Sequence, residues 1–227
     1  MAADQDDAEV LQDIVELASQ LGVTVREVSR KEIESEARTE SHQGVVAFAR
    51  PLDEADIDTL VSDARDGRTG ARVAPFLLAL DGVTDPGNLG ALLRTAECAG
   101  VTGVLLPRHR AVHVTPTVAK TAAGAVEYLP IALVGGLPAA INQLKSNGVW
   151  VIGLDAEGDT ELFDLTLADE PVCLVMGAEG AGLSRLVRER CDAVASIPMH
   201  GNLASLNVSA AGALACYEIA RRRIRTA

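Results

Sequence analysis

Six short apolar runs within residues 73–227 constrain the fold of this 227-residue chain more than any other feature. None of them alternates apolar with polar residues, as a strand with one solvent-facing side would. A continuous apolar run is instead typical of a parallel strand that is buried on both faces. The runs lie at residues 74–80, 103–106, 129–134, 149–154, 172–176 and 193–197.

Helical stretches separate these runs, at residues 89–99, 116–124, 137–146, 183–190 and 206–223. Strands that alternate with helices indicate an α/β fold, with one parallel sheet covered by helices on both faces. Aromatic residues make up only 3% of the chain although 48% of it is hydrophobic. The core must therefore be built mainly from Ala, Val, Leu and Ile.

The first 72 residues have a different character. Residues 1–68 hold 17 acidic and 7 basic side chains, and so carry −10 of the total net charge of −12. A helix at 9–21, a strand at 23–28, a helix at 30–38 and a strand at 44–49 predict a small α/β domain over residues 1–50. Residues 51–72 are rich in Asp, Gly and Arg and are expected to form a linker, with up to two helical turns at 57–64.

Bulk features narrow the class of protein. No stretch reaches the roughly 18 apolar residues of a membrane span, and the acidic start is unlike a signal peptide, so we expect a cytoplasmic protein. The cysteines are far apart and lie in or beside apolar stretches. This arrangement predicts buried free thiols rather than disulfides or zinc ligands. They are Cys98, Cys173, Cys191 and Cys216.

Four arginines near the C-terminus leave two interpretations open. They could form a cationic patch that meets phosphates, or a solvated helix end whose charges complement the helix dipole. They are Arg221, Arg222, Arg223 and Arg225.

Three loops that follow predicted strands hold nearly all of the unusual polar residues, and open α/β sheets bind ligands at this edge. In the first loop, Asp85-Pro86-Gly87 forms a turn and Asn88 is expected to cap the following helix. Arg94 lies on that helix six residues later. Taken alone, Asn88 is most simply a helix cap and Arg94 a surface charge.

The second loop, residues 177–182, follows a buried strand, and its three glycines would let a ligand approach the backbone closely. Its spacing is Gly-x-x-Gly-x-Gly and therefore not the dinucleotide fingerprint Gly-x-Gly-x-x-Gly. Glu179 within the loop would repel a pyrophosphate. A cofactor without phosphate, such as the sulfonium cation S-adenosylmethionine, fits this loop better.

The third loop starts at Ile197 and leads into an Ala-rich helix, where Ser205, Asn207 and Ser209 alternate with apolar residues. A helix cap accounts for either Ser205 or Asn207, but a single cap needs only one of them. The remaining polar side chains are therefore candidates for binding.

Together the three loops resemble the ordered motifs of the SpoU/TrmH methyltransferases, RNA 2′-O-methyltransferases of the SPOUT superfamily. The resemblance covers residues 75–224, and the motifs show no departure from the family pattern. It implies a deep trefoil knot near the C-terminus of an α/β domain at residues 73–227. The matching segments are Asp85-Pro-Gly-Asn88-Leu-Gly with Arg94-Thr-Ala-Glu97, Gly177-Ala-Glu179-Gly-x-Gly-Leu, and Ile197-Pro-Met with Ser205-Leu-Asn207-Val-Ser.

The resemblance also implies the chemistry. S-adenosylmethionine would donate a methyl group to the 2′-hydroxyl of an RNA ribose, and no metal would be needed. Arg94 would either accept the hydroxyl proton with help from a substrate phosphate, or only clamp that phosphate and orient the hydroxyl. The implied catalytic residues are Arg94, Asn88, Glu179, Ser205 and Asn207, and backbone groups around Gly177, Ile197, Met199 and Leu206 would hold the cofactor.

The front segment resembles part of a second domain. Val25-Arg-Glu-Val-Ser and His42-Gln-Gly-Val-Val-Ala are similar to the second half of the small ribosomal-protein-like domain of the RlmB-like branch, the ribosomal RNA guanosine 2′-O-methyltransferases. The first strand and helix of that domain are absent, so the chain is expected to begin late. The likeness favours a guanosine ribose of 23S ribosomal RNA as the substrate.

Three other functions would require different features in the sequence. A transfer RNA substrate would keep the same chemistry, and an inactive RNA-binding relative would be expected to lack Asn88, Arg94 or Asn207, all of which are present. A nicotinamide-dependent oxidoreductase would need the missing fingerprint and an acidic residue about 20 positions later.

A homodimer is also expected. The Ala-rich face of residues 208–219 permits close packing of helices, and the resemblance implies that a partner subunit covers the site. The alanines are Ala210, Ala211, Ala213 and Ala215.

Overall fold

The computed structural model describes residues 8–37, 42, 44–109, 113–166 and 170–226 of the chain. They belong to two compact units, Met1–Pro51 and Leu52–Ala227. Among the helices of the described ranges, none is both long enough and apolar enough to cross a bilayer.

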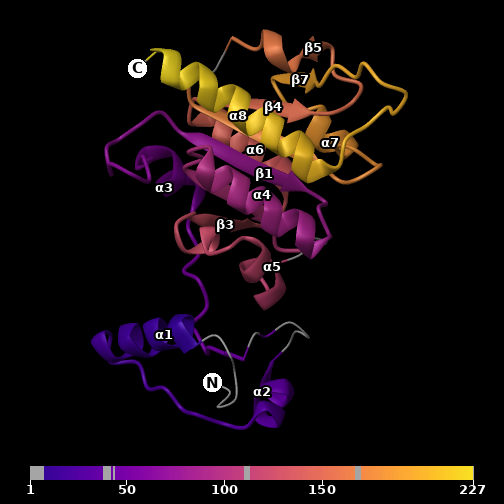
Figure 1. Cartoon of the computed structure of the whole chain (residues 1–227). Helices are drawn as coiled ribbons and strands as arrows, with labels where there is room; N and C mark the ends of the chain where they lie inside the picture. Colours follow the sequence, from indigo (N-terminus) through magenta and orange to yellow (C-terminus); the bar gives the residue numbers. More distant parts are fainter. Residues whose placement is uncertain (1–7, 38–41, 43, 110–112, 167–169, 227) are drawn as a thin grey trace. The chain divides into compact units, whose positions relative to one another are not determined.

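A seven-stranded parallel sheet forms the centre of the larger unit (Figure 1). The strand order is β3-β2-β1-β6-β4-β7-β5. Six strands coincide with the six predicted apolar runs to within two residues, whereas β5 is too short for a sequence pattern to reveal. The strands are β1 (Phe76–Asp81), β2 (Gly103–Pro107), β3 (Ile131–Val134), β4 (Trp150–Leu154), β5 (Thr160–Glu161), β6 (Val172–Gly177) and β7 (Ala193–Ser196).

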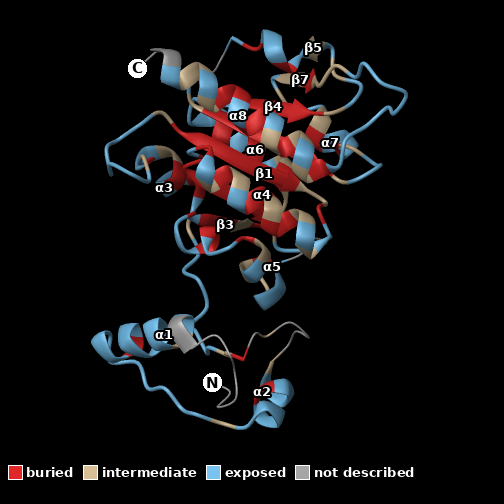
Figure 2. Ribbon diagram, in the orientation of Figure 1, coloured by how far each residue is buried: buried red, intermediate tan, exposed pale blue. Residues whose placement is uncertain are grey.

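Helices cover both faces of this sheet, and the predicted α/β class is confirmed. One face packs against α4 (Pro86–Cys98), α5 (Pro116–Thr121) and α8 (Val208–Thr226). The other face packs against α3 (Ile57–Ser62), α6 (Leu137–Ser146) and α7 (Arg185–Arg188). The strands between these two layers are the most buried part of the unit (Figure 2).

Helix α4 begins earlier than predicted, and its cap differs from the expected one. Asp85 is the capping residue, and its carboxylate accepts the amide of Asn88 at 2.7 Å, with Pro86 in the first turn. Proline suits that position because the first helical amides have no partner within the helix. The expectation that Asn88 caps the helix is therefore wrong, and its side chain is available for another contact.

The stretch expected to be a linker, residues 51–72, belongs to the larger unit from Leu52 onward. The predicted helical turns exist as α3, which buries Ile57 and Leu60. Leu60 lies so close to Gly103 that a Cβ at residue 103 would come within 2.6 Å of its Cδ2. The polar composition of the stretch concealed this apolar anchor.

The front unit contains the two predicted helices, α1 (Ala8–Gln20) and α2 (Arg30–Glu36); Arg38 lies outside the described residues. The strands predicted at 23–28 and 44–49 are absent, and Val28 takes part only in an isolated bridge. A strand requires a ladder partner and a buried face. Among the described residues these segments form no ladder, and Val23 and Phe48 are 60% and 86% exposed rather than buried.

The cysteines are all free, but not all of them are buried. Cys173 and Cys216 are buried and Cys191 is half-buried, whereas Cys98 is exposed on α4, so the expectation of a buried thiol is wrong for Cys98. Burial raises the pKa of the Cys191 thiol to about 11, the main cause being desolvation. That thiol is therefore protonated near neutral pH.

Three of the four C-terminal arginines are paired within the described part of the chain. Arg221 and Arg222 both donate to the carboxylate of Glu218, whose side chain is only 6% exposed. Arg223 donates to the carbonyls of Ala74, Pro75 and Glu170, at 2.7, 3.0 and 2.9 Å. The pairs with Glu218 lie within α8, whereas Arg223, together with a hydrogen bond from Arg222 to the carbonyl of Phe163, fastens the helix to the rest of the unit. The side chain of Arg225 lies outside the described residues.

Candidate cofactor and catalytic site

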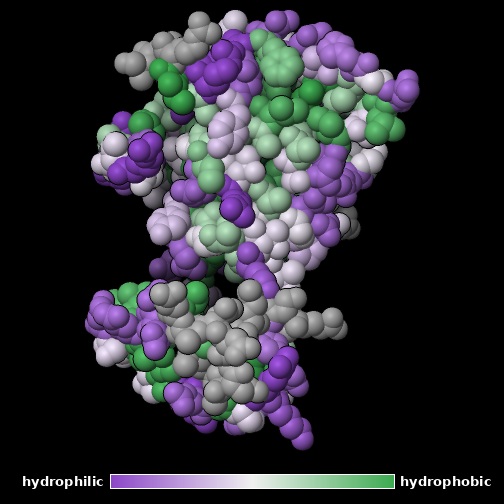
Figure 3. All heavy atoms as spheres, in the orientation of Figure 1, coloured by the Kyte–Doolittle hydropathy of each residue, from purple (hydrophilic) through white to green (hydrophobic). Residues whose placement is uncertain are grey.

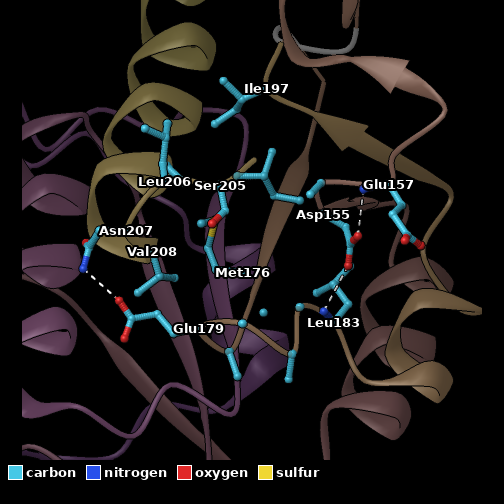
Figure 4. Close-up of a pocket in the computed structure, with 18 of the residues that line it drawn as sticks. Asp155, Glu157, Met176, Glu179, Leu183, Ile197, Ser205, Leu206, Asn207 and Val208 are labelled. Carbon is cyan, nitrogen blue, oxygen red and sulfur yellow. Dashed lines mark hydrogen bonds between the residues drawn. The ribbon is translucent and has the colours of Figure 1, made fainter. Parts of the chain in front are cut away.

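The candidate site lies at the carboxyl edge of the sheet. Because β1, β6 and β4 are neighbours, the loops that follow them share this edge. A cavity of about 590 Å³ opens between the loops after β4, β6 and β7 and the start of α8 (Figure 4). Two of the three loops singled out in the sequence line this cavity.

The loop after β6 is shaped by its glycines. Ala178 and Gly182 exchange two backbone hydrogen bonds of 3.0 Å, which close the loop into a tight turn. Gly180 and Gly182 have φ angles of +73° and +64°, in the left-handed region that favours glycine. A Cβ on Gly177 would lie 2.2 Å from the carbonyl carbon of Gly182. The loop's own packing thus requires these glycines.

Side chains from all three sequence loops meet beside the cavity. The Nδ2 of Asn207 donates to Oδ1 of Asn88 at 3.0 Å and to Oε1 of Glu179 at 2.8 Å. Figure 4 shows the bond between Asn207 and Glu179 at the mouth of the cavity. We call Asn88, Glu179 and Asn207 the amide–carboxylate triad. Folding brings together residues that are up to 119 positions apart in the chain.

Asn207 also caps α8, as the sequence suggested. Its Oδ1 accepts the backbone amide of Ser209 at 2.8 Å and the Ser209 hydroxyl at 2.5 Å. The side chain of Asn207 therefore caps the start of the helix and also holds the triad together. Ser205 lines the cavity, and its hydroxyl makes no hydrogen bond to a described residue.

The residues expected to hold the cofactor lie together. All four line the cavity, three of them in the loop between β7 and α8, where they contribute apolar surface and backbone groups. Met199 and Leu206 are 38% and 40% exposed, which is high for large apolar side chains and consistent with a ligand-facing position. The four are Gly177, Ile197, Met199 and Leu206.

Arg94 lies elsewhere. It is exposed on α4, does not line the cavity, and makes no hydrogen bond to a described residue. Six residues of helix separate it from Asn88, which places the two side chains roughly 120° apart around the helix axis. A single chain therefore does not bring Arg94 into contact with the triad.

Sequence reasoning missed a fourth loop, after β4. Asp155, Glu157 and Arg188 line the cavity. The signal was available, because Asp155-Ala-Glu157-Gly follows a predicted strand. Its relevance depends on β4 lying next to β6, which the order of elements along the chain does not reveal.

Asp155 is held ionised. Partial burial raises the pKa of its carboxyl. The amides of Glu157 and Leu183, at 3.0 and 3.2 Å, and the Arg188 guanidinium, at 3.0 Å, together lower it by more, so that the net pKa lies below the usual range. The charged lining residues are thus three carboxylates, Glu179 being the third, and one guanidinium that is already paired. Such a lining favours a cationic ligand over a phosphate.

The larger part of the chain matches a family of known proteins. Residues 75–217, which contain all three motif loops, match the SpoU rRNA methylase family. The chain belongs to the SpoU family. A second match, over residues 2–55, is to a family described as RNA 2′-O ribose methyltransferase substrate binding.

Several relatives of this SpoU chain carry one name. The 23S rRNA (guanosine-2′-O-)-methyltransferase RlmB of Photobacterium profundum is 40% identical over 223 residues, which cover 97% of this chain and 87% of the relative. The protein of the same name from Coxiella burnetii is 43% identical over 217 residues, covering 96% and 84%.

Solved SpoU structures share the fold. An AdoMet-bound rRNA methyltransferase from Sinorhizobium meliloti aligns with a TM-score of 0.75 at 29% identity, covering 94% of this chain and 77% of that one. The SpoU methyltransferase AviRb from Streptomyces viridochromogenes aligns with a TM-score of 0.74 at 24% identity, covering 98% and 81%.

Proposed function

We propose that this SpoU-family chain is an S-adenosylmethionine-dependent RNA methyltransferase that modifies the ribose 2′-hydroxyl of a guanosine in 23S ribosomal RNA. The observation that carries this proposal is the amide–carboxylate triad beside the cavity, because it unites the three family motifs. The names of the relatives support 23S ribosomal RNA and guanosine as the substrate.

The cavity fits S-adenosylmethionine in its chemistry. Its charged lining is predominantly acidic, which suits a sulfonium cation and disfavours a nucleotide phosphate. Backbone groups at Gly177, Ile197, Met199 and Leu206 would hold the adenosine and methionine parts. The bound cofactor supplies an electrophilic methyl group on sulfur.

The polar residues of the chain serve the RNA side. A ribose hydroxyl is a poor nucleophile near neutral pH and must lose its proton during the reaction. The triad and the unpaired Ser205 hydroxyl supply donors and acceptors that would orient the ribose. Arg94 would accept the hydroxyl proton with help from a substrate phosphate, or would clamp that phosphate.

We also propose a homodimer. The face of the larger unit that carries α8 mixes pale green and pale purple residues (Figure 3). On this helix Leu214 and Tyr217 are exposed by 43% and 52%, and Ala210 is exposed as well. Arg94 also faces outward, away from its own triad. A second copy packed on this side offers a way to bring Arg94 to a triad, that of the partner.

The remaining features of the proposal concern the whole chain. The front residues 1–50 would capture RNA, in line with the match of residues 2–55 to a substrate-binding family. Residues 73–227 would form the methyltransferase domain, whose C-terminal part would be threaded through a trefoil knot as the family resemblance implies. A ribosomal RNA substrate implies action in the cytoplasm.

Two experiments test this function. Calorimetry should detect binding of S-adenosylmethionine without added metal, and tight binding of NAD or ATP in its place would contradict the cofactor. Mapping of 2′-O-methyl groups in RNA from cells with and without the protein should reveal a guanosine in 23S ribosomal RNA that depends on it. A dependent site in transfer RNA would instead support the alternative substrate.

A further inference from the structure

Two carboxylates flank the start of the glycine loop, residues 177–182. Asp81 ends β1 and pairs in register with Gly177 of β6. Asp155 directly follows β4, whose last residue, Leu154, pairs with Met176 of β6. Since β6 lies between β1 and β4, the two carboxylates stand on opposite sides of the strand end from which the loop starts.

Each carboxylate accepts an amide at the far end of the loop. Oδ2 of Asp81 accepts the amide of Ser184 at 2.7 Å, and Oδ2 of Asp155 accepts that of Leu183 at 3.2 Å. Figure 4 shows the bond between Asp155 and Leu183. Hydrogen bonds to an ionised acceptor are roughly twice as strong as neutral ones. Both neighbouring strands therefore hold the exit of the loop.

Asp155 is itself held in place. Its Oδ1 accepts the amide of Glu157 at 3.0 Å and pairs with the Arg188 guanidinium at 3.0 Å. The loop packs directly on this carboxylate, since a Cβ on Gly182 would come within 2.6 Å of Oδ2. The side chain thus has little room to move, and neither has the loop.

The opposite side of the same loop faces the cavity. Residues 177–183 all line it, and Glu179 reaches from the loop to Asn207. Asp81 does not line the cavity. Any effect of Asp81 on a ligand must therefore pass through the loop.

We propose that Asp81 and Asp155 form a carboxylate brace, a pair of positioning residues that hold the glycine loop in the conformation that binds S-adenosylmethionine. This inference rests on the proposed function. Holding the loop in advance reduces the ordering cost of binding. Neither carboxylate takes part in methyl or proton transfer.

Substitution by Asn tests the brace in the full chain. An Asn amide is close in size to the carboxylate, but it lacks the charge. We expect Asp81→Asn and Asp155→Asn each to raise the Kd of S-adenosylmethionine, measured by calorimetry, by about tenfold or more. Because Asp155 also lines the cavity, the Kd reports the brace through Asp81, and the hold of Asp155 on the loop is read from hydrogen exchange. Asp56→Asn is the matched control, because Asp56 accepts the amide of Thr59 at 2.8 Å at the start of α3. It should lower thermal stability and leave the Kd unchanged.

Hydrogen exchange gives a readout that needs neither cofactor nor RNA. In the wild-type protein the amides of Leu183 and Ser184 should exchange more slowly than those of Gly180 and Ala181, which donate no hydrogen bond to a described residue. Each substitution in the brace should speed exchange over residues 178–184.

Two results would overturn the brace. One is a Kd within about twofold of the wild type in folded Asp81→Asn. The other is wild-type exchange at Leu183 and Ser184 as fast as at Gly180, which decides the question even if a variant does not fold. Failure of the wild type to bind S-adenosylmethionine would count against the proposed function instead, and the exchange pattern would still test the brace.

Discussion

Asn207 can satisfy its amide in only one orientation. Its oxygen accepts from Ser209, and its nitrogen donates to Asn88 and Glu179. The reversed amide would set two donors against each other at Ser209 and two acceptors against each other at Glu179. The Asn207 amide thereby also fixes the orientation of the Asn88 and Glu179 side chains. It leaves Nδ2 of Asn88 and Oε2 of Glu179 for a ligand.

Asn207→Asp separates the two roles of this residue. An Asp side chain still accepts the Ser209 amide and caps α8 well, but it cannot donate to Asn88 and Glu179. We expect methyl transfer to fall by about a hundredfold or more, while the cap itself is kept. Single-turnover methylation and thermal melts measure the two effects. Asn207→Ala should lose both activity and the cap, and normal turnover by Asn207→Asp would remove the triad from the mechanism.

Arg94 is expected to act in the methyl-transfer step and not in cofactor binding. Arg94→Ala should leave cofactor affinity nearly unchanged and lower methyl transfer by about a hundredfold or more. Arg94→Lys should remain impaired, because an ammonium lacks the planar fork that can hold a phosphate and a hydroxyl together. Single-turnover assays on ribosomal RNA fragments, alongside calorimetry, test both variants. Equal losses of binding and turnover would make the role structural.

At the scale of elements, α8 connects the site to the base of the sheet. Asn207 caps its first turn beside the cavity. Its last turns are anchored by Arg222, which donates to the carbonyl of Phe163, and by Arg223, whose guanidinium also lies 5.1 Å from the centre of the Phe76 ring. Close contact with α4 is possible because Gly212 faces Leu92, where a Cβ would come within 2.3 Å of Cδ2. The helix is therefore held at both ends and in the middle.

Glu218→Gln tests the ion pairs that Glu218 makes with Arg221 and Arg222 within α8, through their pH dependence. Hydrogen bonds from Arg221 and then Arg222 lower the pKa of Glu218 against the opposing effect of burial. A lowered pKa in the folded state stabilises the fold above the unfolded pKa, and this contribution is lost as pH falls through the folded pKa. We expect the variant to lose about 1–3 kcal/mol at pH 7, and the difference from wild type to shrink below about pH 4.

Denaturant unfolding at several pH values measures this difference. Asp66→Asn is a useful control, because Asp66 accepts the Thr69 amide at 2.7 Å in an exposed turn and its pKa is also lowered, mainly by the hydrogen bonds from Thr69. A difference in stability between Glu218→Gln and wild type that does not change with pH would show that the charge of Glu218 contributes nothing to the stability.

At the scale of the whole molecule, the separation of Arg94 from the triad bears on whether the active form is a dimer. Each lies at the surface of the larger unit, but on different sides of α4. Two copies related by a twofold axis would exchange Arg94 reciprocally, since such interfaces use the same patch on both chains. Activity would then require the dimer.

Mixing variants tests this arrangement. Sedimentation should give twice the monomer mass of 23.7 kDa at micromolar concentration. Equal amounts of Arg94→Ala and Asn207→Asp chains, unfolded and refolded together, should recover about a quarter of wild-type activity, because half of random dimers are mixed and each has one intact site. No recovery would assign Arg94 to its own chain, and a monomer would contradict the dimer.

Much of the fold follows from local pattern. Continuous apolar runs predicted six of the seven strands, since burial on both faces leaves no position for a polar side chain. Sequence patterns gave wrong predictions where the structure depends on contacts with distant parts of the chain. Residues 23–28 and 44–49 have strand-like composition but no ladder, and the polar stretch 51–72 conceals Ile57 and Leu60, which pack in the core.

The candidate site, too, was predicted only in part from the sequence. Motif order in the sequence indicated Asn88, Glu179 and Asn207, because chemistry requires particular side chains whatever the fold. Tertiary structure alone decided that these three meet, that Arg94 stands apart from them, and that Asp81 and Asp155 hold the glycine loop from either side. The reason is that the order of strands in a parallel sheet differs from their order in the chain, so neighbours at its carboxyl edge are set by packing over the whole unit.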